Sequence, residues 1–182
     1  MMGGRVAETP PAPILLDEAR AFLRLGAAGE EDALLSGLLR AAADTCEAFV
    51  GRTLLVRAVT ETLPAASAWA RLGLAPVVAI DGVAALTGEG GAMALAPADY
   101  AIDIDAAGEG WVRLAKPVDA TRLRVTYRAG LAADANGLPE ALRHGIVRLA
   151  AHLYLQRDGE AGAAPPAAVT ALWRPWRRLR LR

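Results

Sequence analysis

The chain has 182 residues, of which 54% are hydrophobic and 22% charged, and its 20 basic residues balance its 20 acidic ones. This composition excludes an intrinsically disordered protein, and the length suits one domain or one domain with an insertion. A neutral net charge excludes general coating of nucleic acid, so any such contact has to be local. The single cysteine, Cys46, excludes an internal disulfide and indicates a reducing compartment, or one in which disulfides are not needed. Residues 1–13 lack the apolar core of a signal peptide, and no run of about 18 apolar residues predicts a membrane span.

The first third of the sequence predicts an arm and two helices. Residues 1–13 hold three prolines and two glycines and are expected to form a flexible N-terminal arm. An acidic start and a stop at Gly26 predict a short helix over about 17–25. A second helix over 31–50 also begins with acidic residues, has apolar residues at the helical period, and ends at Gly51.

The middle third changes to the period of two that is typical of strands. Alternation over 53–63 and 122–128 predicts two longer strands, and the arginines of the second are expected to point outward. Residues 100–104 and 111–114 predict a hairpin, and the glycine-rich residues 88–91 predict a hairpin turn. Further short strands are predicted at 69–74, 77–80, 83–86 and 93–95.

The last third returns to helices. Pro139 begins a long helix that runs to about 157, since proline is favoured at the first helical position. A short helix over 167–172 follows two prolines, and Pro175 ends it.

The order of elements predicts an α+β fold, with a mainly helical core of about four helices interrupted by a small antiparallel β-rich insertion. We expect a single domain over 14–172 after the N-terminal arm, and an extended C-terminal docking arm over 173–182. Within the domain, the helical core covers 14–52 and 138–172, and the β-rich insertion covers 53–130.

No set of residues has the pattern of a catalytic, metal or cofactor site. His144 and His152 lie on one predicted helix without clustered cysteines or acids, so they do not predict a zinc site. Asp103 and Asp105 resemble the start of a calcium loop that lacks its final bidentate glutamate. Cys46 lies on an apolar helix face, where thiols are inert. We therefore expect a protein that is not an enzyme and binds no cofactor.

The last ten residues, 173–182, hold five arginines, two tryptophans and no acid. Arginine and tryptophan dominate binding hot spots. Three interpretations remain open: a solvated free end, a nucleic-acid contact with arginines on phosphates and tryptophans on bases, and a strand that docks into a protein partner. In the docking strand, the alternate arginines and leucines from position 178 onward point to opposite sides.

Three groups of segments carry a resemblance to a known family. The first is LLDEARAFLR at 15–24 with EDALL at 31–35 and CEAFVGR at 46–52. The second is VTYRAG at 125–130 with LPEALR at 138–143 and HLY at 152–154, and the third is PAAVTAL at 166–172 with RPWRRLR at 174–180. In these segments, and in their order, the chain resembles the head–tail connector (adaptor or head-completion) proteins of long-tailed bacteriophages and of phage-derived gene transfer agents. Trp176 stands where tyrosine is more usual, and the β-rich insertion is poorly matched.

The resemblance implies a structural adaptor that forms a ring under the portal, extends the DNA channel and joins capsid to tail. The implied partners are the portal protein, a downstream tail-completion or stopper protein, and further copies in a cyclic, dodecameric assembly. Channel DNA would pass without sequence-specific binding, and no membrane is implied. The implied location is the particle neck, after assembly in the bacterial cytoplasm. The implied portal-binding residues are Trp173, Arg174, Pro175, Trp176, Arg177, Arg178, Leu179 and Arg180.

The alternative function is that of a small DNA-binding accessory protein that uses the same Arg/Trp-rich arm. In the adaptor interpretation, deletion of 173–182 is expected to leave a folded body that cannot join portal-bearing capsids.

Overall fold

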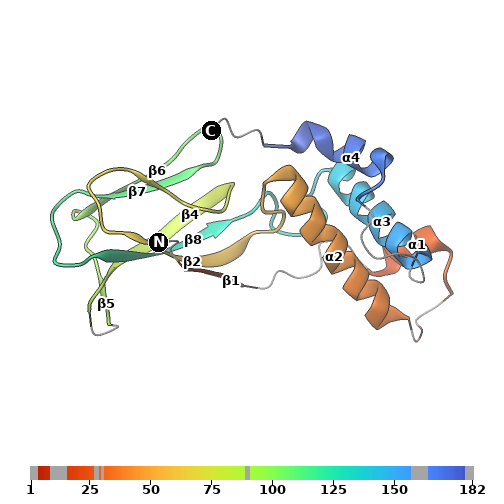
Figure 1. Ribbon diagram of the computed structural model, residues 1–182, viewed down its shortest axis with the longest axis horizontal. Coiled ribbons are helices and arrows are strands. Elements are labelled where there is room, and N and C mark those ends of the chain that lie inside the picture. Colours follow the sequence, from red (N-terminus) through yellow and green to blue (C-terminus); the bar gives the residue numbers. More distant parts are fainter. Residues whose placement is uncertain are drawn as a thin grey trace. The chain divides into compact units, whose positions relative to one another are not determined.

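The computed structural model describes residues 4–8, 16–26, 29, 31–88, 91–156 and 164–178 (Figure 1). The chain divides into two compact units. The β unit consists of Met1–Thr9 and Val56–Gly130, and the helical unit consists of Pro10–Leu55 and Leu131–Arg182.

The helical unit is built on two long helices, α2 and α3, and on two shorter ones. Acidic Asp32 lies in the first turn of α2, where negative charge is favoured by the helix dipole. The helix ends at Gly51, whose φ of 67° is left-handed and whose N–H donates to the carbonyl of Glu47 at 2.9 Å. The elements are α1 (Leu16–Leu23), α2 (Asp32–Val50), α3 (Glu140–Leu155), α4 (Ala167–Trp173) and the 3-10 helix η1 (Arg174–Trp176).

One apolar core holds these helices together. Its members recur every three or four residues along α2 and α3, so each helix buries one continuous face. Ion pairs of Arg143 with Glu18 and of Arg20 with Asp32 tie α1 to α3 and α2. The fully buried members of the core are Ala19, Leu35, Leu39, Ala42, Cys46, Val50, Leu54, Leu142, Ile146, Ala150, Val169 and Trp173.

The β unit contains two antiparallel sheets. The five-stranded sheet has the order β1-β2-β8-β4-β5, with β8 at its centre, and the three-stranded sheet has the order β3-β7-β6. The strands are β1 (Arg5–Ala7), β2 (Arg57–Pro64), β3 (Ala70–Arg71), β4 (Val77–Leu86), β5 (Ala92–Ala94), β6 (Tyr100–Ile104), β7 (Gly110–Leu114) and β8 (Arg122–Ala129).

The alternation along β8 defines the two faces of the larger sheet. Exposed and buried residues alternate over all eight positions, and Leu123, Val125 and Tyr127 are each at most 1% exposed. They share their core with Val112 and Leu114 of β7, so the two sheets enclose one apolar interior. The strand predicted at 122–128, with its arginines outward, is therefore confirmed, as is the hairpin of β6 and β7.

Residues near the N-terminus belong to the larger sheet. Arg5–Ala7 form β1, which pairs with β2 so that Arg5 lies opposite Glu61 and Val6 opposite Thr60. The prediction of a flexible arm over 1–13 is therefore wrong for β1. The outer edge of β2 would otherwise carry unpaired N–H and C=O groups, and a short extended segment satisfies them.

The described residues form a mixed α+β fold with four α-helices and two antiparallel sheets. The α+β class is confirmed, whereas the expectation of a mainly helical protein with a small insertion is not. The strands predicted separately at 77–80 and 83–86 are one strand, β4, with two register shifts. The two sheets bury an apolar core of their own, so the β-rich part is a compact unit and not a small insertion in a helical domain. No helix in the described ranges is long and apolar enough to cross a membrane.

The chain leaves and re-enters the helical unit through neighbouring segments. The N–H of Leu131 donates to the carbonyls of Thr53 and Leu54, at 3.0 Å each, and the N–H of Ala132 donates to that of Leu54 at 3.1 Å. Leu55 and Ala132 form a parallel bridge. All these bonds lie inside the helical unit, which therefore holds the two ends of the β insertion side by side.

Candidate functional site

The C-terminal segment, residues 164–178 as described, is folded onto the helical unit. α4 follows Pro166, whose carbonyl accepts bonds from the N–H groups of Val169 at 2.9 Å and Thr170 at 3.1 Å. Val169 and Trp173, four residues apart, lie on the buried face of α4. The predicted extended arm from residue 173 is therefore replaced by helix as far as Trp176.

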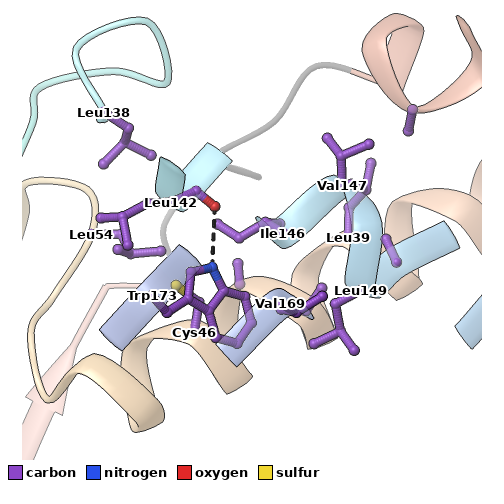
Figure 2. Packing of buried hydrophobic residues seen from close by; sticks show 14 of the residues in the cluster. Leu39, Cys46, Leu54, Leu138, Leu142, Ile146, Val147, Leu149, Val169 and Trp173 are labelled. Atoms are coloured by element: carbon purple, nitrogen blue, oxygen red, sulfur yellow. Dashed lines mark hydrogen bonds between the residues drawn. The ribbon is translucent and has the colours of Figure 1, made fainter. Parts of the chain in front are cut away.

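Trp173 is 0% exposed and has the largest side chain among the fully buried residues that the structure describes. Its indole Nε1 donates a hydrogen bond to the carbonyl of Leu142 at 3.4 Å (Figure 2). Its ring centroid lies 5.8 Å from that of Phe49. This burial corrects the expectation that Trp173 lies in an exposed portal-binding arm, because a large apolar ring with a satisfied N–H is more stable in the core than in water.

Gly145 of α3 makes the space for this indole. A Cβ added to Gly145 would lie 2.1 Å from Nε1 of Trp173, well inside any possible contact distance. The sequence signals for this site are the spacing of Trp173 from Val169 and a glycine inside a long helix. Neither signal is visible when Trp173 is grouped, by local composition, with the arginines that follow it.

After η1 the segment is fixed at the C-terminal end of α2. The N–H of Arg178 donates to the carbonyl of Val50 at 2.8 Å. The guanidinium carbon of Arg177 lies 5.6 Å from the ring centroid of Phe49. The last carbonyls of a helix carry partial negative charge, so two arginines are well placed there.

The remaining predicted portal-binding residues differ in their exposure. Arg174, Pro175 and Arg177 are exposed, whereas Trp176 and Arg178 are partly buried and Trp176 packs against the helical core. The exposed guanidinium groups can bind carboxylates or phosphates through planar, charge-assisted hydrogen bonds. Leu179 and Arg180 lie outside the described residues.

The other candidates from the sequence take structural positions. Cys46 is fully buried, and burial raises the pKa of its thiol to about 12. His144 is exposed and meets the ring of Phe22 edge-on at 6.1 Å, whereas His152 is partly buried on the same helix. Among the described residues, no three or more His, Cys, Asp or Glu side chains are grouped so that they could hold a metal ion.

Asp105 closes the turn between β6 and β7. Its Oδ1 accepts bonds from the N–H groups of Ala107 and Glu109 at 2.9 Å each, and its Oδ2 accepts from Nε1 of Trp111 at 3.3 Å. Asp103 is exposed on β6. β4 and β5, which flank the hairpin turn predicted at 88–91, pair antiparallel, and residues 89 and 90 of that turn lie outside the described residues.

Comparison with known proteins connects this fold to one kind of particle. No protein-family model matches the chain, and no curated protein matches it. The chain is 28% identical to a chain in the neck of an empty gene transfer agent particle with C6 symmetry, with a TM-score of 0.81 over 100% of this chain and 98% of that one. A chain in the virion of a native gene transfer agent particle gives a TM-score of 0.79, and one in the native neck with C12 symmetry gives 0.78, both with the same identity and coverage. The expected similarity to gene transfer agent neck proteins is therefore confirmed.

Proposed function

We propose that this protein is a structural adaptor of a gene transfer agent or phage neck, which forms a ring beneath the portal and joins the capsid to the tail. The similarity of the entire chain to neck chains, at a TM-score of 0.81, carries the proposal. The C6 and C12 symmetries of the similar necks support a cyclic, dodecameric assembly of this chain, with channel DNA passing through it. The portal protein lies on one side of this ring and a tail-completion or stopper protein on the other.

Portal docking is assigned to the C-terminal segment beyond Trp173. Arg174, Pro175 and Arg177 are exposed and lead toward Leu179 and Arg180. The buried indole and the bond from the N–H of Arg178 to Val50 hold the start of this arm in place. An arm that is fixed at its start loses less conformational entropy on docking than a free one, so its geometry favours binding.

Tight attachment then follows from the number of arms. One short arm binds weakly by itself, because it buries little surface. A ring presents many arms at once, so each later arm binds as an intramolecular event at a high effective concentration. Closure of the ring also requires two different, complementary side surfaces on each subunit.

The test is neutralisation of the exposed arginines of the arm in the full-length chain. In the variant Arg174→Gln/Arg177→Gln we expect a native circular dichroism spectrum and at least a tenfold loss of incorporation into portal-bearing capsids. The matched control is Arg40→Gln/Arg148→Gln, which removes the same charge from exposed positions on α2 and α3. If the arm variant joins capsids and supports DNA delivery like the wild type, the arm is not the anchor.

Deletion of residues 173–182, proposed from the sequence as a test of portal docking, does not isolate docking. Removal of 173–182 also removes Trp173, a fully buried core residue, and so tests folding and docking together. Removal of 179–182 leaves the described structure complete. We expect this shorter deletion to weaken portal attachment while the thermal unfolding transition stays unchanged.

A further inference from the structure

The outward face of the five-stranded sheet carries a row of arginines. Arg122, Arg124 and Arg128, here named the arginine stripe, occupy exposed positions of β8. Alternate residues of a strand are about 6.8 Å apart, so the stripe is roughly 20 Å long. Since β8 is the central strand, the stripe runs along the middle of the sheet.

Most residues opposite the stripe are small or carry hydroxyl groups, and Leu86, opposite Arg122 on β4, is a larger apolar one. In register, Arg124 lies opposite Thr62 on β2 and Ala84 on β4. Thr126, between two arginines of the stripe, lies opposite Thr60 and Gly82. Such neighbours are shorter than the arginine side chains, so guanidinium groups with hydroxyl groups beside them line this part of the face. None of the residues paired with the stripe is aromatic.

Few acidic groups neutralise this face. Arg128 pairs with Asp81, with its Nε 3.4 Å from Oδ1, and both side chains are about half exposed. The side chains of Arg122 and Arg124 have no hydrogen bond or ion pair within the described part of the chain. They line a shallow depression at the end of the stripe, together with the hydroxyl-bearing residues Thr87 and Thr121.

We propose that the arginine stripe binds the phosphate backbone of duplex DNA, without regard to base sequence. Arginine and threonine side chains are among the common phosphate contacts of DNA-binding proteins, whereas protein interfaces centre on aromatic anchors. An anchor of that kind lies elsewhere in the β unit, where the guanidinium of Arg113 stacks on Trp69 at 4.8 Å. One strand of the duplex carries a phosphate about every 3.4 Å along its axis, so a stripe of this length spans several.

This inference rests on the proposed function, in which the ring surrounds channel DNA, and it identifies the surface that meets it. A channel has to let DNA move. A few phosphate contacts per subunit allow this, because each contact between an arginine and the DNA is weak and exchanges quickly. Because these contacts involve phosphates and no bases, DNA of any sequence can pass.

The experiment is an NMR titration of the full-length, isotope-labelled protein with a short mixed-sequence DNA duplex at several salt concentrations. We expect the β8 amides and the Nε–Hε signals of the stripe to shift on addition of DNA. Each phosphate contact contributes about 0.9 to the slope of log affinity against log salt, so three contacts give a slope of about −2.7. The variant Arg122→Thr/Arg124→Thr should reduce the magnitude of this slope by about 1.8, since it removes two contacts.

Two variants with the same loss of charge serve as controls. Arg40→Gln/Arg148→Gln should titrate like the wild type, and so should Arg174→Gln/Arg177→Gln, which alters the C-terminal arm. The inference is overturned if DNA shifts only the signals of the arm, if the stripe variant titrates like the wild type, or if no signal moves at low salt. It is also overturned if the β8 signals shift with protein concentration in the absence of DNA and do not respond to DNA, because the face then binds a second copy.

Incorporation into portal-bearing capsids, measured beside DNA binding, tests the adaptor function separately from DNA binding by the arginine stripe. A stripe variant that still joins portal-bearing capsids, while the wild type shows no DNA contact on β8, overturns the inference alone. A wild-type protein that contacts DNA through β8 but never joins such capsids contradicts the adaptor function.

Discussion

Trp173 and Gly145 depend on each other, since the indole occupies the volume that any side chain at position 145 would need. The carbonyl of Leu142, one turn earlier on α3, satisfies the indole N–H. Local composition groups Trp173 with the arginines that follow it, and only the packing partner on another helix shows that it belongs to the core.

Gly145→Ala tests this packing. Alanine improves helix propensity by about 1 kcal/mol, but the clash with a buried ring should cost more, so we expect a net destabilisation of about 1–3 kcal/mol. Urea unfolding followed by far-UV circular dichroism measures it. The matched control is Gly37→Ala in α2, where an added Cβ has its nearest neighbour at 4.0 Å and should stabilise the protein. Equal stability of Gly145→Ala and the wild type would contradict the assigned packing.

Cys46 should resist alkylation in the folded protein. The thiolate is the reactive form, and burial raises the pKa of this thiol to about 12, so little thiolate exists near neutral pH. We expect no mass increase with iodoacetamide at about pH 8 until urea unfolds the helical unit. The variant Ser67→Cys places a thiol at an exposed position of the same protein and should react at once. Similar labelling rates at the two positions would show that Cys46 is accessible.

At the scale of elements, a buried polar link joins the central strands to the loop after β3. The hydroxyl of Tyr127 on β8 donates to Oε2 of Glu61 on β2 at 2.8 Å, and accepts from the N–H of Leu74 at 3.2 Å. The N–H of Gly73 also donates to Oε2 of Glu61, at 2.9 Å. Because this link sits between elements of the two sheets, it fixes how the loop closes over the core of the β unit.

Tyr127→Phe should destabilise the β unit in a pH-dependent way. Burial, and next the hydrogen bond to Glu61, raise the pKa of Tyr127 above its ordinary value. The unfolded chain loses this proton near pH 10 while the folded chain keeps it, so the contribution to stability is full below about pH 10 and falls as the pH rises further. The variant should lose about 1–3 kcal/mol at neutral pH, because the N–H of Leu74 loses its acceptor.

The measurement is urea unfolding between neutral pH and about pH 11, where the fall in stability should be shallower for Tyr127→Phe than for the wild type. Tyr100→Phe, at a partly buried position of β6, is the control and should keep the wild-type slope. Parallel curves for Tyr127→Phe and the wild type would exclude Tyr127 as the titrating group.

Helices and strands with a regular pattern of apolar residues could be predicted from the sequence. Those that form only by pairing with another strand could not. β8 alternates over its whole length and α2 has acidic and glycine boundaries, so both were predicted within a few residues. β1 is three residues long, and pairing with β2 alone makes it a strand. β4 was predicted as two strands because Gly82 interrupts the pattern, whereas the register shifts along β8 absorb the interruption. At the candidate site, the exposed arginines could be predicted and the burial of Trp173 could not.

At the scale of the whole molecule, residues 56–130 of the β unit are an insertion whose ends are held together by the helical unit, while β1 joins the same unit from the N-terminal side. Leu55 and Ala132 are bridged, so the chain returns close to the point at which it left. The two units have separate apolar cores. Each unit can therefore be expected to fold largely on its own contacts.

Replacement of residues 57–129 by a short Gly-Ser linker, in a chain that starts at Pro10, should leave the helical unit folded. The linker joins neighbouring ends, so its closure entropy is small. We expect a cooperative thermal transition and a blue-shifted emission from the buried Trp173. Excision of 57–132 also removes the bonds of Leu131 and Ala132 and should give a less stable product. A molten product from the first excision would show that the helices need the sheets.

The bridged junction has a consequence for how such proteins diverge. Since both ends of the inserted strands are fastened within the helices, recombination between related genes can lengthen or exchange this insertion while the helical unit keeps its own contacts, provided that the new insertion still pairs with β1. A lineage of such particles can thus keep an old scaffold of helices while it acquires new surfaces by trading a single cassette.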